Sequence, residues 1–142
     1  MAIRALAGIG LGVALLLTTR VALPADDTAQ TIRGTIAVDP ALPQYLEPGD
    51  RLIIKLFHPG DGVELDAKYN IVDRFTLPLE FAVSPAIDMA GRTKFQAYVI
   101  EIFTDKNGDV LGVAPGELQG GTAEPVALGT TGLTLKLAAL RE

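Results

Sequence analysis

The feature that most constrains the fold is a run of residues with apolar side chains on both faces of an extended strand. Residues 94–103 read KFQAYVIEIF. One side of this strand carries Phe95, Ala97, Val99 and Phe103, and the other carries Tyr98, Ile100 and Ile102. A strand of this kind either lies at the centre of a sheet with both faces covered, or is half-covered and open to a partner.

Several other segments alternate apolar and polar residues with the period of two that indicates a strand. They are residues 31–38, 51–57, 67–74, 76–83 and 131–140, with a short one near 110–113. Pro78 lies inside one of them and indicates a strand edge or end, because proline cannot donate to a ladder. After residue 25 no stretch shows a sustained helical period. The pattern predicts an all-β domain, an antiparallel β-sandwich of about seven strands of immunoglobulin-like or prealbumin-like type.

The N-terminus has the pattern of an export signal. Arg4 supplies a short positive region, and residues 5–17 (ALAGIGLGVALLL) are uncharged and almost wholly apolar, which is the length of a signal-peptide core rather than of a membrane span. Cleavage after about Ala25 and retention of residues 5–23 as an apolar helical anchor both remain open. The expected organisation is a signal peptide or anchor over 1–25, a linker over 26–30 and the β-sandwich over 31–142, in the periplasm and either free or anchored to the inner membrane.

Charge and composition exclude several function classes. Without residues 1–25 the chain has ten basic and 17 acidic residues, a net charge of −7. Such a domain is poorly suited to nucleic acid or to an anionic membrane surface, so the membrane is expected to matter only through the N-terminal segment. There is no cysteine, which excludes a thiolate metal site, a redox pair and a lipidated N-terminus.

The sequence DKNGDVLG at residues 105–112 begins like a calcium-binding EF-hand loop. Asp105, Asn107 and Asp109 match the first three ligand positions, but Val110 stands where glycine is needed and Gly116 where a bidentate carboxylate is needed. The Asn-Gly pair favours a two-residue hairpin in which residues 104–106 pair with 109–111. We expect a turn rather than a metal site.

No group of residues forms a recognisable catalytic motif. His58 is the only histidine, and hydroxyls such as Ser84 and Thr76 stand in no nucleophile motif around it. Asp61, Glu64 and Asp66 lie close enough in sequence for two carboxylates to converge, but a solvated loop explains them better, since the chain has no Trp and few aromatic residues to bind a sugar. We therefore expect no enzymatic activity and no cofactor.

The turns and strands together resemble the periplasmic C-terminal domain of the CcmI/CycH family of cytochrome c maturation factors. The matching residues are Gly34, Thr35, Asp39, Pro40, Leu42, Pro48, Gly49, Asp50, Leu77, Pro78, Leu79, Asp88, Met89, Gly116, Glu117, Leu118 and Gly120. The strand order is also similar to that of the YbaY/YscW group of small exported β-sandwich proteins, some of which are lipoprotein chaperones of secretion systems. The first resemblance implies a non-enzymatic role in holding an apocytochrome or another partner.

The leading functional hypothesis is an exported binding protein that assists assembly or stability of a c-type cytochrome or another membrane or periplasmic complex. Its expected partner is an apocytochrome or a membrane-complex subunit, contacted through the strand 94–103 and its neighbours; the candidate residues are Phe57, Tyr98, Ile100 and Ile102. The alternative for this strand is that both its faces are simply core. Two other functions stay open: a membrane-anchored accessory subunit, and a small calcium-dependent binding module or hydrolase that uses the acidic loops.

Overall fold

The computed structural model describes residues 29–142, which fold almost entirely into strands. The elements are β2 (Ile32–Val38), a short 3-10 helix η3 (Pro43–Tyr45), β3 (Arg51–Pro59), β4 (Glu64–Asp73), β5 (Leu79–Val83), β6 (Ala97–Asp105), β7 (Leu118–Gly121), β8 (Val126–Ala127) and β9 (Leu133–Leu140). The prediction of an all-β domain is confirmed. Among these residues no helix has the length and apolar character needed to cross a membrane. The predicted leader, its cleavage site and most of the linker lie outside the described residues.

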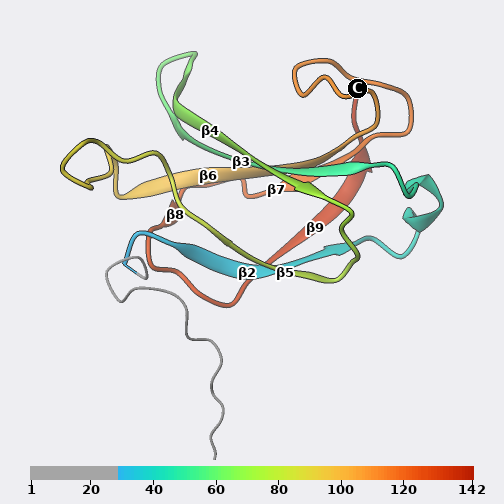
Figure 1. Ribbon diagram of the computed structural model, residues 1–142, viewed down its shortest axis with the longest axis horizontal. Helices are drawn as coiled ribbons and strands as arrows, with labels where there is room; N and C mark the ends of the chain where they lie inside the picture. Colours follow the sequence, from blue (N-terminus) through green and yellow to red (C-terminus); the bar gives the residue numbers. More distant parts are fainter. Residues whose placement is uncertain (1–28) are drawn as a thin grey trace, which may run out of the picture.

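The strands form one continuous curled sheet instead of the separate sheets expected for a β-sandwich. The order is β4-β3-β6-β7-β9-β2-β5, and β8 pairs with β6 beside this path. Figure 1 shows β9 crossing diagonally between the upper strands and the lower pair β2 and β5, so that the sheet folds over on itself like half of a barrel. The pairing is also not wholly antiparallel, because β2 runs parallel to β9. Alternation predicts which residues share a face, but it does not specify strand order.

The core lies inside the curl. Alternate residues of six strands contribute buried side chains to one cluster, among them Ile32, Ile36, Leu52, Leu56, Tyr98, Ile100, Leu118 and Leu137. Burying each large aliphatic side chain stabilises the fold by about 2 kcal/mol. The inner face of the curled sheet therefore buries its apolar side chains against one another, as the two facing sheets of a sandwich do.

The loop after β6 differs from the predicted hairpin. Residues 109–111 pair with no strand, and β6 instead pairs with β7 at residues 119–121. The buried carboxylate of Glu117 organises this loop, because it accepts hydrogen bonds from the backbone N–H groups of Lys106 (2.7 Å) and Ala114 (3.1 Å) and from the guanidinium of Arg141 (3.0 Å). Glu117, eleven positions after Lys106, thus outweighs the local preference of the Asn-Gly pair for a two-residue hairpin. The expectation that Pro78 marks a strand end is confirmed, since it directly precedes β5.

The parallel pairing of β2 with β9 depends on a glycine. A Cβ atom added to Gly34 would lie 2.0 Å from the carbonyl oxygen of Leu133 on β9. No side chain fits at that distance without moving one strand away from the other. Gly34 is thus the residue that lets the first and last described strands approach closely enough to pair.

We expect Gly34→Ala to lower the free energy of unfolding by about 3 kcal/mol, because an overpacked site forces the backbone to shift. Gly49→Ala is the matched control, since nothing lies within 4 Å of its added Cβ. Urea unfolding followed by circular dichroism measures both. Equal stability of the two variants would show that the β2–β9 contact is not close-packed.

Candidate functional site

The residues predicted to bind a partner do not form an exposed patch. Tyr98, Ile100 and Ile102 on β6 each have 0% exposed surface and belong to the core cluster. Phe57, on β3, is half-buried on the outer face of the sheet. A partner could reach the three β6 side chains only if the fold opened, so a binding role for these residues remains a prediction.

Phe57 has a structural neighbour on the outer face. The ammonium group of Lys55 lies 5.1 Å from the centre of the Phe57 ring and 5.3 Å from that of Tyr69, and it pairs with the carboxylates of Glu64 and Glu101. Burial alone would lower the pKa of Lys55, but the hydrogen bond to Glu64 and the charge of Glu101 outweigh it and raise the pKa. Lys55 therefore stays charged, and its ion pairs are satisfied within the chain.

The residues of the EF-hand-like stretch each have a partner other than a metal. Asp105 is buried and pairs with Arg51, with 2.9 Å between Arg51 Nε and Asp105 Oδ2. Asn107 accepts a hydrogen bond from the N–H of Asp109, which in turn accepts one from Leu111. Within residues 29–142 no group of three or more acidic or histidine side chains is placed to hold a metal ion.

His58, Glu64 and Asp66 lie in structural contacts, and Asp61 is exposed. The His58 ring stacks on Phe95 with centroids 3.8 Å apart, and its Nδ1 lies 2.9 Å from the carbonyl oxygen of Ala97. Glu64 pairs with Lys55, whereas Asp66 accepts a hydrogen bond from Tyr98. These carboxylates thus point to different partners, and Ser84 is bonded to Thr31 rather than to the imidazole.

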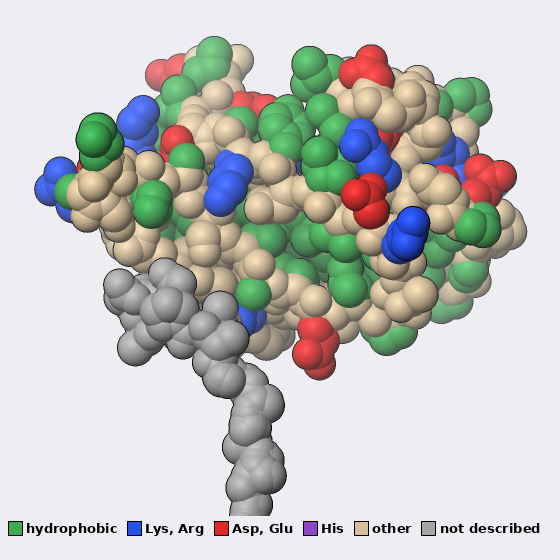
Figure 2. Space-filling model, viewed as in Figure 1, with side chains coloured by type: hydrophobic (Ala, Val, Ile, Leu, Met, Phe, Trp, Pro, Cys, Tyr) green, Lys and Arg blue, Asp and Glu red, His purple; other side chains and the backbone are tan. Residues whose placement is uncertain are grey.

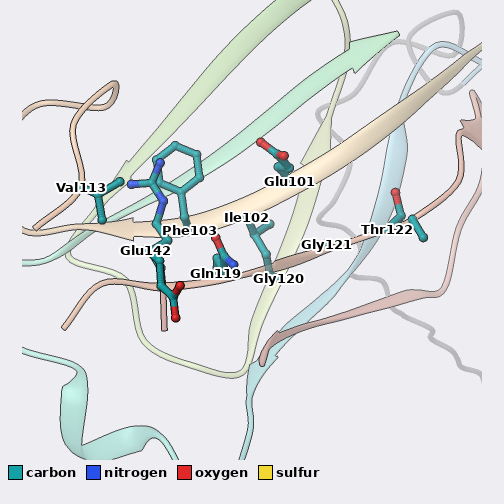
Figure 3. Close-up of a pocket in the computed structure, with 11 residues that line it drawn as sticks. Glu101, Ile102, Phe103, Val113, Gln119, Gly120, Gly121, Thr122 and Glu142 are labelled. Carbon is teal, nitrogen blue, oxygen red and sulfur yellow. The ribbon is translucent and has the colours of Figure 1, made fainter. Parts of the chain in front are cut away.

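A hollow of about 430 Å³ lies on the outer face across β6 and β7. Figure 3 shows Glu101 and Phe103 projecting from the same side of β6, with Val113 and Glu142 beside the Phe103 ring. Arg141 lies 3.9 Å above that ring and is paired with Glu117. The hydroxyl of Thr122 accepts a hydrogen bond from the N–H of Ile100. The Thr122 hydroxyl is thus engaged by the backbone, and the one cation of the hollow, Arg141, is already paired.

A second hollow lies between the two edges of the sheet. It has a volume of about 260 Å³ and is lined by one wall from β4, by Ile54 at its floor and by β5 on the far side. Val72, Leu79, Phe81 and Val83 supply its apolar surface. Figure 2 shows hydrophobic side chains gathered at the surface in the middle of one face, between the upper strands and the lower pair β2 and β5. We call the opening between β4 and β5 the edge groove.

The edge groove separates two strands whose outer edges have no neighbour in the described chain. β4 pairs only with β3, and β5 pairs only with β2. Unpaired edges present backbone N–H and C=O groups to solvent, and proteins usually cover or protect them. The curl brings these two edges to face each other across an apolar floor without joining them.

A hydrogen bond fixes the β4 wall to the core. Asp66 has a φ of +55° at an irregularity in the β3–β4 register, where one strand carries an extra residue. Its Oδ2 accepts a hydrogen bond of 2.6 Å from the buried hydroxyl of Tyr98. Burial, together with this bond to Asp66, raises the pKa of Tyr98 to about 12.

The edge groove was not predicted from the sequence, although the sequence holds one signal for it. Residues 67–74 have a weak strand pattern, and in the structure the inward side of β4 includes the polar residues Lys68 and Asn70. Polar residues on both faces are typical of an edge strand. The position of that edge opposite β5 could not be predicted, because it follows from the strand order.

Asp105→Asn should lower the free energy of unfolding by about 2 kcal/mol, because it leaves the partly exposed Arg51 without its buried partner. This loss of stability should be the same in a buffer with calcium and in a buffer with a chelator. Thermal unfolding of both proteins in each buffer measures it. A melting temperature that calcium raises in the parent chain and not in the variant would contradict the ion-pair role.

Tyr98→Phe should change how stability depends on pH. The unfolded tyrosine releases its proton near its ordinary pKa of about 10, whereas in the folded chain the pKa is about 12. Between these values the unfolded state binds fewer protons, so stability falls as pH rises. The variant should be less stable by about 1 kcal/mol at neutral pH, and this difference should shrink between about pH 10 and 12. Urea unfolding from pH 8 to 12 tests this, and a constant difference would count against the bond.

Comparisons with known proteins do not establish a family. No family model matches the chain, and no curated protein matches it. The resemblance to the cytochrome maturation domain therefore finds no support in the comparisons. One similar solved structure is an alternative pilotin from the type II secretion system of Vibrio cholerae, with 16% identity and a TM-score of 0.49 over 80% of this chain and 98% of that chain. A likeness at this level does not transfer a function.

Proposed function

We propose that this protein is an exported, non-enzymatic binding protein that takes an extended segment of a partner protein into the edge groove. The observation that carries the proposal is the pair of unpaired edges, β4 and β5, facing each other across an apolar hollow of about 260 Å³. The site is built from backbone groups and apolar side chains, which suits recognition of a peptide rather than catalysis.

An added strand would satisfy the backbone of an edge. Strands pair at a spacing of about 4.8 Å, and an extended peptide gains its affinity from main-chain hydrogen bonds and its specificity from side chains that enter pockets at alternate positions. Leu79, Phe81 and Val83 alternate along β5 and face the hollow, so a peptide beside them would find apolar contacts at every second residue. This favours a partner segment rich in β-branched and other apolar residues.

The cellular role follows from the expected leader. A protein exported to the periplasm that holds an extended apolar segment would shield that segment until its complex is assembled. We therefore place its partner among the components of a membrane or periplasmic complex, with residues 5–23 as an anchor if the leader is retained. The calcium or hydrolase alternative is not favoured, because the acids it needs are engaged by Arg51, Lys55 and Tyr98.

A displayed library of random eight-residue peptides tests the proposal. Selected peptides should alternate apolar residues, and Ala82→Trp should weaken their binding at least about tenfold, which is a loss of about 1.4 kcal/mol. Ala82 is exposed and lines the groove, so a large side chain there blocks the groove without entering the core. Ala138→Trp, at an exposed position on β9 outside the groove lining, is the matched control and should leave binding unchanged.

Thermal unfolding of both tryptophan variants shows whether they fold. A photo-reactive group on a selected peptide should label β4 or β5. Failure to enrich any peptide over an unrelated protein, or labelling confined to other strands, would refute the proposal.

A further inference from the structure

The edge groove continues beyond its apolar part into a charged end. A neighbouring hollow of about 280 Å³ is lined by Asp66 of β4 and by the segment that follows β5, including Ile87, Asp88 and Lys94. The apolar hollow is lined by Asn70 and Val72, further along β4. The two hollows therefore follow one another along the same wall. We call them the apolar end and the charged end of the groove.

Lys68 lies between the two ends. It pairs with Leu56 on β3, whose side chain is in the core, so Lys68 starts from the inward side of β4. Asp66, two residues before it, lines the charged end, and Asn70, two residues after it, lines the apolar end. A peptide lying along β4 would pass Lys68.

Some charged side chains of the groove have a partner of opposite charge within the chain, and others do not. Asp66 accepts a hydrogen bond from the neutral Tyr98 hydroxyl and keeps its negative charge, whereas the charge of Asp88 is paired with Arg92. Lys68 and Lys94 make no ion pair with any residue in the described part of the chain. Glu80 lines the apolar end and would repel an acid placed there. At this end of the groove the two unpaired lysines, Lys68 and Lys94, therefore outnumber the one unpaired carboxylate, Asp66, and leave a net positive charge.

We propose that the segment bound in the edge groove carries an acidic side chain beside its apolar run, and that this carboxylate lies against Lys68 and Lys94. The inference rests on the proposed function and adds to it the chemistry of the partner and the placement of its two parts. The apolar residues lie against β5 at the apolar end, and the acid lies at the charged end.

The test compares two versions of one selected peptide, with glutamate or lysine at the position next to the apolar run. The parent protein should bind the glutamate version about tenfold more tightly, because it gains an attraction where the other meets a like charge. Lys68→Glu should reverse this preference. Lys136→Glu on β9 makes the same change of charge at an exposed lysine outside the groove, and the parent preference should survive it.

The failures of the two proposals are distinguishable. If Ala82→Trp abolishes binding but Lys68→Glu leaves the preference unchanged, the groove binds peptides and the acidic partner is wrong. If Lys68→Gln strengthens the binding of both versions alike, Lys68 only guards the edge against pairing, and the inference is overturned. A photo-reactive group next to the glutamate should label Asp66 or Ile87, and labelling of Leu79 instead would also overturn it.

Discussion

The parallel pairing of β2 with β9 is the contact on which the rest of the structure depends. β2 and β5 reach the other strands only through β9, so this ladder joins two parts of the sheet that are otherwise separate. It pairs the first described strand with the last, and Gly34 permits the close approach. Without it, β5 would have no fixed position opposite β4 and the edge groove would not exist.

The same curl explains why the protein has a groove instead of a closed barrel. A closed barrel would require β4 and β5 to pair with each other. Instead, a hollow lined by Ile54, Val72 and Phe81 lies between the two strands. The β4 wall is held in place by the bond from Tyr98 to Asp66. The groove is therefore part of the folded sheet, bounded on both sides by ordered strands.

Some of this was predictable from the sequence. Alternation predicted the segments of β2, β3, β4, β5, β6 and β9, and Pro78 marked the start of β5, because both signals are local. The short strand expected near 110–113 is absent, and the short strands β7 and β8 were not predicted. The two-sided strand 94–103 was expected to be either central or open to a partner, and β6 is central, between β3 and β7. The predicted hairpin after Asp105 does not form, because the Glu117 carboxylate binds the backbone N–H groups of Lys106 and Ala114 and so sets the course of the loop. The site could not be predicted, since Val72 of β4 and Phe81 of β5 line the same groove only because of the strand order.

The most direct test of this account is hydrogen exchange of the free protein, followed amide by amide by NMR. The strand β6, which pairs with β3 on one side and with β7 and β8 on the other, should protect nearly all its amides, while β4 and β5 should protect only alternate ones, those that face β3 and β2. That result would show two open edges. Continuous protection along both β4 and β5 would show that the edges pair with each other, and it would contradict the groove on which the proposed function rests.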